Sequence, residues 1–378
     1  MNAAPQEHLE RPPPQRPRAL GRYYLHDVIG TGGMATVHLG WMASASRIVA
    51  IKRLRADLAK NAEFIAMFAD EARVALRIDH PNVVSAIEVV QADGESFLVM
   101  EYVPGASVSQ LSQRALGRGE RVPPAVATSI VTAMLHGLQA THEAKDGRGE
   151  PLAIVHRDVS PQNVIVGTDG TTRLLDFGVA DAAGNLRLRP GGELRGKIHY
   201  MAPEQLNHDG VVSRRSDLYA AAVVLWETLC GRRLFKDELR GEALPAASGV
   251  HRACVDALVR RYAEIPAPST LVPGVSRALD EVILRALEPA PSKRFATADE
   301  MARAIEASGP LASEAEIGAW VRSLDDEELA ARERLVRDIA RSGGIVSVAR
   351  AEESEELPRE TQGRSRRWSG VRARHVAG

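Results

Sequence analysis

The first hundred residues place hydrophobic and polar positions in short alternating runs. "YYLHDVIG", "TVHLGWM" and "RIVAIKRL" are rich in β-branched residues, with glycine or serine between them, which predicts three strands. "VVSAIEVVQADGESFLVMEYV" predicts two more strands, joined by a turn at Asp93-Gly94. One helix interrupts the strands, because "AEFIAMFADEARVALRI" repeats its hydrophobic residues at helical spacing. Its expected buried face carries Phe64, Met67, Phe68, Ala72 and Leu76.

After "VPGAS" the pattern becomes mainly helical. "VPPAVATSIVTAMLHGLQATHEA" predicts a long apolar helix, and "VIVGTDGTTRLLD" predicts a hairpin around Asp169-Gly170. "SDLYAAAVVLWETLC" predicts another helix, with Ser216 as its N-cap and Gly231 just past its end. Residues 276–288 and 297–307 predict two further helices.

These elements predict an α+β architecture of two lobes. Residues 22–103 form a strand-rich lobe and residues 104–307 a larger helical lobe. Residues 308–345 are charged and amphipathic, so we expect a helical extension of one or two helices. Residues 1–21, rich in proline and arginine, and 346–378, with an acidic and then a basic run, are expected to be disordered tails.

Composition narrows the function classes. The 378 residues are 44% hydrophobic, enough for a large core. With 48 Lys+Arg against 49 Asp+Glu, the net charge of -1 gives no global field to recruit nucleic acid or an anionic membrane. We expect neither a signal peptide nor a membrane span, since the most apolar helix is short and contains Glu227. Only two cysteines are present, which favours a cytoplasmic protein without disulfides.

A glycine-rich stretch, "GTGGMATV", begins at Gly30 between two predicted strands. A dinucleotide-binding loop would lead into a helix, whereas strand, glycine-rich turn and strand make a flap whose backbone N–H groups can approach phosphates. Downstream, Lys52 of "VAIK" lies in the middle of an apolar strand and can reach phosphates as a point charge. Glu71, in the middle of the following helix, is its expected anionic partner.

Two further motifs supply what phosphoryl transfer requires, which is mainly positioning and cancellation of charge. In "HRDVSPQN", we expect Asp158 to orient a substrate hydroxyl and accept its proton. Asn163 of the same motif and Asp176 of "DFG" are hard oxygen ligands suited to Mg²⁺.

These motifs and "APE" occur in an order that resembles one family. Residues from about Tyr23 to Ile305 look like a eukaryotic-like protein kinase domain and are most similar to bacterial serine/threonine kinases. The resemblance implies a bilobal fold, with an antiparallel sheet and one key helix in the N-lobe and a helical C-lobe. It also implies transfer of the ATP γ-phosphate to Ser/Thr hydroxyls of proteins, with Mg²⁺. The implied nucleotide contacts are Ile29, Gly30, Thr31, Gly32, Gly33, Met34, Ala35, Thr36, Val37, Ala50, Lys52, the gatekeeper Met100 and the hinge residues Glu101 and Val103.

The resemblance implies structural roles as well, and two positions depart from the family pattern. Glu204 would pair with Arg294, and Asp217 would brace the catalytic loop. Ser160 stands where these kinases usually carry a phosphate-contacting lysine, and Lys197 stands where they usually carry a threonine. Because the two positions are neighbours in the family fold, we expect Lys197 to supply the missing cation and Ser160 the missing hydroxyl. In the alternative, Lys197 is a solvated loop residue and the kinase is slow.

The segment between "DFG" and "APE" bears on control. It contains no serine or threonine, and Tyr200 is its only hydroxyl. In this family Arg157 of "HRD" normally binds a phosphate in this segment, and Glu193 is a candidate fixed anion in its place. We therefore expect a kinase that does not require Ser/Thr phosphorylation here.

Other interpretations stay open. A pseudokinase scaffold would bind nucleotide or a partner without turnover; Ser160 favours it, and the intact motif residues oppose it. A small-molecule kinase is disfavoured by "APE" and by the helical lobe. The C-terminal extension is expected to be either a regulatory segment, which includes docking of a soluble partner, or a solvated tail.

Overall fold

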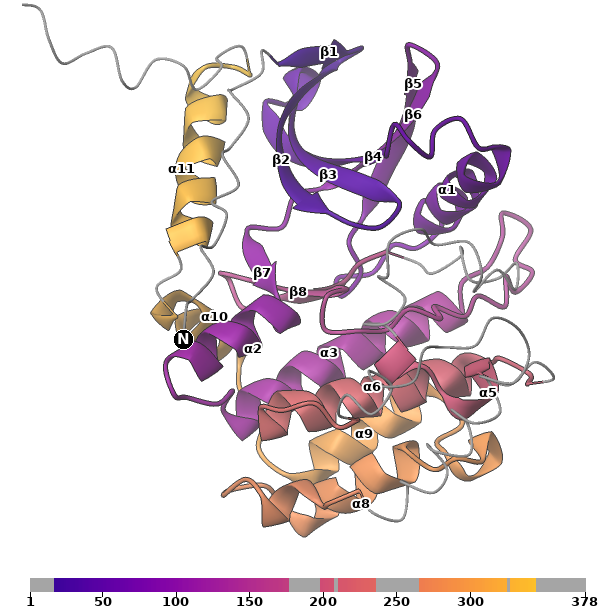
Figure 1. Cartoon of the computed structure of the whole chain (residues 1–378), viewed down its shortest axis with the longest axis vertical. Helices are drawn as coiled ribbons and strands as arrows, with labels where there is room; N and C mark the ends of the chain where they lie inside the picture. Colours follow the sequence, from indigo (N-terminus) through magenta and orange to yellow (C-terminus); the bar gives the residue numbers. More distant parts are fainter. Residues whose placement is uncertain (1–16, 177–197, 207–209, 236–264, 325–326, 345–378) are drawn as a thin grey trace, which may run out of the picture.

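The computed structural model describes residues 17–176, 198–206, 210–235, 265–324 and 327–344. Within these residues, a smaller lobe built on an antiparallel sheet lies against a larger helical lobe (Figure 1). The sheet has six strands in the order β1-β2-β3-β4-β6-β5. They are β1 (Arg18–Leu20), β2 (Tyr23–Thr31), β3 (Ala35–Met42), β4 (Arg47–Leu54), β5 (Ala86–Ala92) and β6 (Glu95–Glu101).

Helix α1 (Ala62–Ala75) leads from β4 towards β5 and buries one face in the smaller lobe. The predicted face is confirmed at most positions, with Met67 partly buried. Leu76 was wrongly assigned to it: the helix ends at Ala75, so Leu76 is the C-cap and is 42% exposed. The buried positions of α1 are Phe64, Phe68, Ala72 and Ala75.

Both predicted hairpin turns are confirmed. Asp93 and Gly94 both have positive φ, 52° and 77°, as a two-residue turn between antiparallel strands requires. In the larger lobe, β8 (Val164–Gly167) and β9 (Thr172–Leu174) pair around Gly170, whose φ is 91°. They form a three-stranded sheet with β7 (Gly105–Ser107).

The N-terminal tail prediction is wrong for residues 18–20, which form β1. Arg18 is opposite Leu25 and Leu20 is opposite Tyr23 in an antiparallel ladder with β2. Leu20 is 1% exposed and packs in a hydrophobic cluster with Tyr23. The strand was not visible in the sequence, because it follows a proline-rich stretch and three residues are too few to show a period of two. Its hydrogen bonds are made with β2.

Helix α6 (Arg214–Cys230) lies at the centre of the larger lobe, with nearly every side chain buried. The N-cap assignment to Ser216 was wrong. Ser213 is the N-cap, and Ser216 is the third helical residue of a capping box, with its hydroxyl accepting from Ser213 N–H at 3.2 Å. Gly231 follows the helix with φ 64°, as predicted. No described helix is long and apolar enough to cross a membrane.

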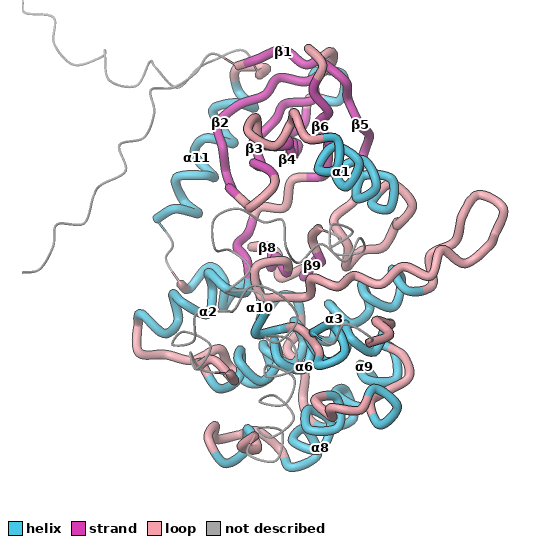
Figure 2. Tube along the Cα trace, turned by 45° about the vertical axis from the view of Figure 1, so that its right-hand side comes forward, coloured by secondary structure: helices cyan, strands magenta, loops and turns pink. Residues whose placement is uncertain are grey.

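Other helices surround α6 in this lobe (Figure 1), and Figure 2 shows them from a second side. The two helical stretches predicted at 276–288 and 297–307 are confirmed as α8 and α9. The helices around α6 are α2 (Val108–Gly117), α3 (Pro124–His142), α5 (Pro203–Leu206), α8 (Arg277–Ala286) and α9 (Ala298–Ser308).

The C-terminal extension contacts both lobes. Helix α10 (Glu314–Ser323) inserts Ile317 and Val321 into the core of the larger lobe. Helix α11 (Glu327–Arg341) then runs beside the sheet of the smaller lobe (Figure 1). There Ile339, 1% exposed, packs with Leu39 and Trp41 of β3. The cluster is completed by the partly buried Tyr24, Ile29, Ile48, Tyr102, Leu335 and Val336.

Candidate active site

Lys52, on β4, joins the sheet to two other elements. Its side chain is 9% exposed, and Nζ lies 2.5 Å from Oε1 of Glu71 on α1 and 2.8 Å from Oδ1 of Asp176. Burial alone would lower the pKa of Lys52, but the charges of Asp176 and Glu71 outweigh it, and the pKa is raised. Burial raises the pKa of Glu71, and the charge of Lys52 opposes that shift. The lysine therefore stays charged between two carboxylates.

Asp158 and Asn163 lie together in the loop before β8. Asn163 Nδ2 donates to Asp158 Oδ2 at 2.9 Å and to the Asp158 carbonyl at 2.8 Å. Asp217, in the first turn of α6, binds the backbone of this loop. Its carboxylate accepts from the backbone N–H of His156 at 2.9 Å and of Arg157 at 2.8 Å. The expected bracing role of Asp217 is thus present in the geometry.

Two residues of the site adopt backbone conformations that side chains usually avoid. Arg157 has φ 64° and Asp176 has φ 46°. Such left-handed non-glycine residues cost about 1–3 kcal/mol and persist where surrounding contacts fix them. Asp217 supplies such a contact at Arg157, and Lys52 supplies one at Asp176.

His156 connects the two loops that carry Asp158 and Asp176. It is fully buried, with Nε2 3.1 Å from the Leu175 carbonyl and Nδ1 3.3 Å from the Asp158 N–H. These partners suit a neutral ring that donates from Nε2 and accepts at Nδ1. Burial lowers the pKa of His156, which favours the same neutral form. We did not assign His156 a role from the sequence, although its place in "HRDVSPQN" was the signal.

The glycine-rich stretch is the turn of the β2–β3 hairpin, as predicted. Gly30 is opposite Val37, Thr31 is opposite Thr36, and Gly32 N–H donates to the Ala35 carbonyl at 2.8 Å. The hairpin lies over the hydrophobic cluster that contains α1, with Met34 and Val37 packed against that cluster. Other expected nucleotide contacts belong to the same cluster, namely Ala50, Met100 and Val103.

Glu101 lies at the end of β6, next to the connection between the lobes. Its carboxylate accepts from Ser85 N–H at 2.9 Å and lies 3.4 Å from Arg173. The Glu101 side chain is therefore bound to Ser85, the residue before β5. The expected adenine contact involves the backbone of Glu101, not its side chain.

A buried ion pair fixes the segment after the candidate site. Arg294, with a fully buried side chain, donates from Nη1 and Nη2 to the carboxylate of Glu204 at 2.7 and 2.9 Å. The guanidinium also donates to the carbonyls of Arg215, Glu288 and Pro289. This two-pronged pair was expected from the resemblance and satisfies the charge of both partners.

Comparison with known proteins identifies the family. A family model described as a protein kinase domain matches residues 23–304. The chain belongs to the protein kinase family. The tyrosine-protein kinase MasK of Myxococcus xanthus is 35% identical over 289 residues, which cover 76% of this chain and 43% of MasK. The serine/threonine-protein kinase PrkC of Bacillus subtilis is 33% identical over 284 residues, 75% of this chain and 40% of PrkC.

A third relative matches beyond the kinase domain. The serine/threonine-protein kinase Pkn1 of Myxococcus xanthus is 32% identical over 361 residues, 94% of this chain and 45% of Pkn1. The chain thus spans less than half the length of these three relatives. Among solved structures, the kinase domain of Mycobacterium tuberculosis PknI is similar with a TM-score of 0.56 and 25% identity. That match covers 78% of this chain and 99% of PknI's kinase domain. The kinase fold expected from the sequence is confirmed.

In this kinase domain the two departures from the family pattern are only partly visible. Ser160 is 1% exposed, and its hydroxyl oxygen has no hydrogen-bond partner among the described residues. Lys197, its expected counterpart, and Glu193, the expected substitute anion, lie outside the described residues, as do Phe177 and Gly178.

Tyr200, the one hydroxyl between "DFG" and "APE", is buried in a network that sequence reasoning missed. Its hydroxyl donates to Glu227 at 2.7 Å, and burial raises its pKa. Arg233 donates to both the Tyr200 oxygen and Glu227. The signal for this network was Glu227, a carboxylate within the apolar part of α6.

Two residues of the site could hold a Mg²⁺ ion together with a nucleotide. No described cluster of three His, Cys, Asp or Glu residues could hold a metal ion by itself. Asn163, bonded to Asp158, and Asp176, paired with Lys52, carry side-chain oxygens that would serve as two ligands. Mg²⁺ in phosphoryl transfer takes only one or two protein ligands and completes its shell with phosphates and water. The donor set therefore fits Mg²⁺ together with a nucleotide.

Proposed function

We propose that this protein is an active kinase that transfers the γ-phosphate of ATP to Ser/Thr hydroxyls of proteins. The observation that supports it best is the position of Lys52 between Glu71 and Asp176, at 2.5 and 2.8 Å. A buried lysine held charged by two carboxylates has a cation ready for phosphates. The chain retains every residue type that this chemistry needs except at Ser160.

In this proposal each residue has one task. Lys52 neutralises phosphate charge, and Asn163 and Asp176 hold Mg²⁺, which supplies further charge neutralisation when bound. Asp158 accepts a hydrogen bond from the substrate hydroxyl and takes up its proton as the oxygen attacks phosphorus. Asn163, bonded to Asp158 at 2.9 Å, keeps that carboxylate oriented. The flap and the backbone of Glu101 and Val103 would bind the nucleotide.

The serine/threonine preference rests on relatives. PrkC and Pkn1 carry that specificity in their names, whereas MasK is named a tyrosine kinase. A test is transfer of labelled phosphate to a generic basic protein, followed by phosphoamino-acid analysis. The pseudokinase alternative predicts ATP binding without transfer and is favoured only by Ser160.

We also propose that Lys197 and Ser160 have exchanged roles. Support comes from the buried Ser160 hydroxyl, which makes no hydrogen bond to any residue that the structure describes. An unpaired buried hydroxyl costs about 1–3 kcal/mol, so a donor such as an ammonium group would satisfy it. We further propose activity without Ser/Thr phosphorylation in the segment before Ala202, which contains neither residue. The buried Tyr200 hydroxyl, already bonded to Glu227, supports the same view.

The extension has a proposed role within the chain. Helix α10 packs into the larger lobe and α11 onto β3, so together they brace the two lobes. The cluster around Ile339 includes Tyr102 of the hinge and Ile29 of the flap. A regulatory partner would then act by competing for α11. We also propose a cytoplasmic location. A kinase needs ATP, and Cys230 is a free buried thiol, as is usual in a reducing compartment.

A further inference from the structure

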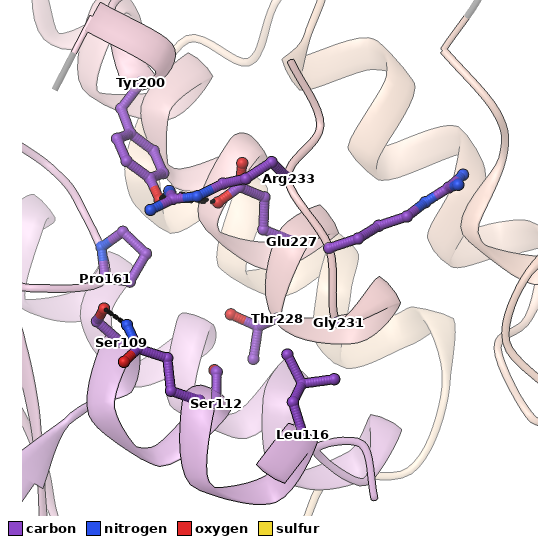
Figure 3. Close-up of a pocket in the computed structure, with 11 residues that line it drawn as sticks. Ser109, Ser112, Leu116, Pro161, Tyr200, Glu227, Thr228, Gly231 and Arg233 are labelled. Carbon is purple, nitrogen blue, oxygen red and sulfur yellow. Dashed lines mark hydrogen bonds and ion pairs between the residues drawn. The ribbon is translucent and has the colours of Figure 1, made fainter. Parts of the chain in front are cut away.

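A pocket of about 280 Å³ lies beside the catalytic loop (Figure 3). One wall is α2, with Ser109 and Ser112, and the other is the end of α6, with Glu227 (Figure 3). Pro161, three residues after Asp158, lines the pocket, and its carbonyl accepts from Ser109 N–H at 2.9 Å. The pocket is therefore joined to the loop that would hold the substrate hydroxyl.

Among the described residues that line the pocket, the one carboxylate is that of Glu227, and it is already satisfied. Glu227 has a side chain only 8% exposed and accepts from Tyr200 at 2.7 Å, from Leu234 N–H at 3.0 Å and from Arg233 at 3.1 Å. Its negative charge is therefore neutralised within the chain. A basic side chain entering the pocket would have to displace Arg233 to reach it.

The Arg233 guanidinium uses only part of its hydrogen-bonding capacity on the described residues. Its side chain is 45% exposed, and both hydrogen bonds it makes to described residues come from Nη1. A guanidinium carries five N–H donors, and Nε and Nη2 make no hydrogen bond to a described residue, so they can donate to an anion. Figure 3 shows Arg233 beside Tyr200 and Glu227 at one end of the pocket, with the hydroxyl-bearing Ser109 and Ser112 on the facing wall.

We propose that this pocket binds an acidic side chain of the protein substrate and so selects acidic sequences near the phosphorylated residue. This inference rests on the proposed function, because it assigns the substrate class of that same site. Arg233 would hold the carboxylate or phosphate group through Nε and Nη2, a fork that matches a planar anion. The serine hydroxyls would donate from the opposite wall.

The test uses fluorescent peptides with a single serine, in which Glu, Gln, Lys or phosphoserine is placed in turn at each flanking position. Both kcat/KM and binding by anisotropy are measured with the full chain. We expect Glu to be favoured over Gln about tenfold at one or two positions. Arg233→Gln should reduce that Glu/Gln ratio to near one. Arg277→Gln, an exposed arginine on α8 outside the pocket, should leave the ratio intact.

A second variant guards against misfolding of the first. Ser112→Glu adds a negative charge to the pocket without touching Glu227 and should also remove the preference. The inference is overturned if Glu and Gln are equivalent at every position, if Lys is preferred, or if both variants keep the wild-type ratio. The phosphoserine peptides show whether the favoured anion is a phosphate or a carboxylate. If no peptide is phosphorylated but acidic peptides bind and Arg233→Gln abolishes that binding, the proposed function fails and the pocket assignment stands.

Discussion

Glu71 on α1 lies 2.5 Å from Lys52 on β4, although 19 residues separate them in the chain. The pair joins the helix of the smaller lobe to the strand beneath the flap. Asp176 completes the network from the other lobe, at 2.8 Å from the same ammonium. The Lys52 ammonium is therefore held in place by contacts between three elements, namely β4, α1 and the segment that carries Asp176.

Glu71→Gln tests the importance of this pair. The change removes one charge beside Lys52 while Asp176 remains, so we expect kcat/KM for ATP to fall about tenfold to a hundredfold. Asp70→Asn is the matched control on the same helix, because Asp70 pairs with Arg73 at the surface. Steady-state kinetics at varied ATP measures the effect. Equal activity of the two variants would show that the pair does not position Lys52.

The proposed exchange of roles between Ser160 and Lys197 predicts that a single variant loses phosphotransfer and that a double variant recovers part of it. Lys197→Ala should lower phosphotransfer about 10²–10³-fold, as loss of a preorganised charge at a transferring phosphoryl group does, with ATP binding little changed. Ser160→Lys combined with Lys197→Thr should recover part of that loss. Single-turnover rates and ATP affinity separate the two effects. A Lys197→Ala enzyme with the wild-type rate would rule out the exchange.

The brace formed by α11 predicts that its buried contact matters to both stability and nucleotide binding. Ile339→Asp places a charge in the cluster with Leu39 and Trp41. We expect the free energy of unfolding of the protein to fall by about 3–5 kcal/mol. We also expect KM for ATP to rise, since Ile29 and Tyr102 share the cluster. Ala340→Asp puts the same residue at the next, exposed position and is the control. Matching melting temperatures and KM values for the two variants would contradict the brace.

His156 predicts a loss of stability in mild acid. Its folded-state pKa lies below the ordinary 6.5 because it is buried, so below pH 6.5 the unfolded state binds a proton that the folded state refuses. The contribution of the neutral His156 ring to the free energy of unfolding is fully present above pH 6.5. It is lost as the pH falls from there towards the folded-state pKa, at up to about 1.4 kcal/mol per pH unit. Burial lowers the pKa of His26, His38 and His80 in the same direction.

Denaturant unfolding of wild type and His156→Asn between about pH 8 and 5.5 isolates this histidine. Wild type should lose stability with acid more steeply than the variant, since the variant lacks the titrating ring. Parallel curves for the two proteins would mean that His156 takes up its proton equally in both states.

The sequence was most informative where spacing alone defines the chemistry. Lys52 lies against Glu71 and Asp176, and Asn163 lies against Asp158. Four of these residues were found from short motifs, and Glu71 from its place in the middle of a predicted helix. The turns at Asp93-Gly94 and Asp169-Gly170 were equally predictable, since Asp93, Gly94 and Gly170 have positive φ, which glycine and aspartate tolerate better than most residues.

Other features depend on tertiary partners and were beyond the sequence pattern. Ser213 and Ser216 both suit an N-cap, and only the reciprocal bonds of the capping box decide between them. The apolar stripe of α11 was visible, but nothing in its period shows that Ile339 packs on Trp41. The bond from Arg233 to Glu227 joins residues six apart across a helix end, where no periodic rule applies.

The most direct test of the account is transfer of labelled γ-phosphate from ATP by wild type and by Asp158→Asn, with ATP binding measured for both. We predict label on a protein substrate with wild type, none above background with the variant, and similar ATP binding. Wild type that binds ATP but transfers no label would contradict the account and identify the chain as a nucleotide-binding scaffold.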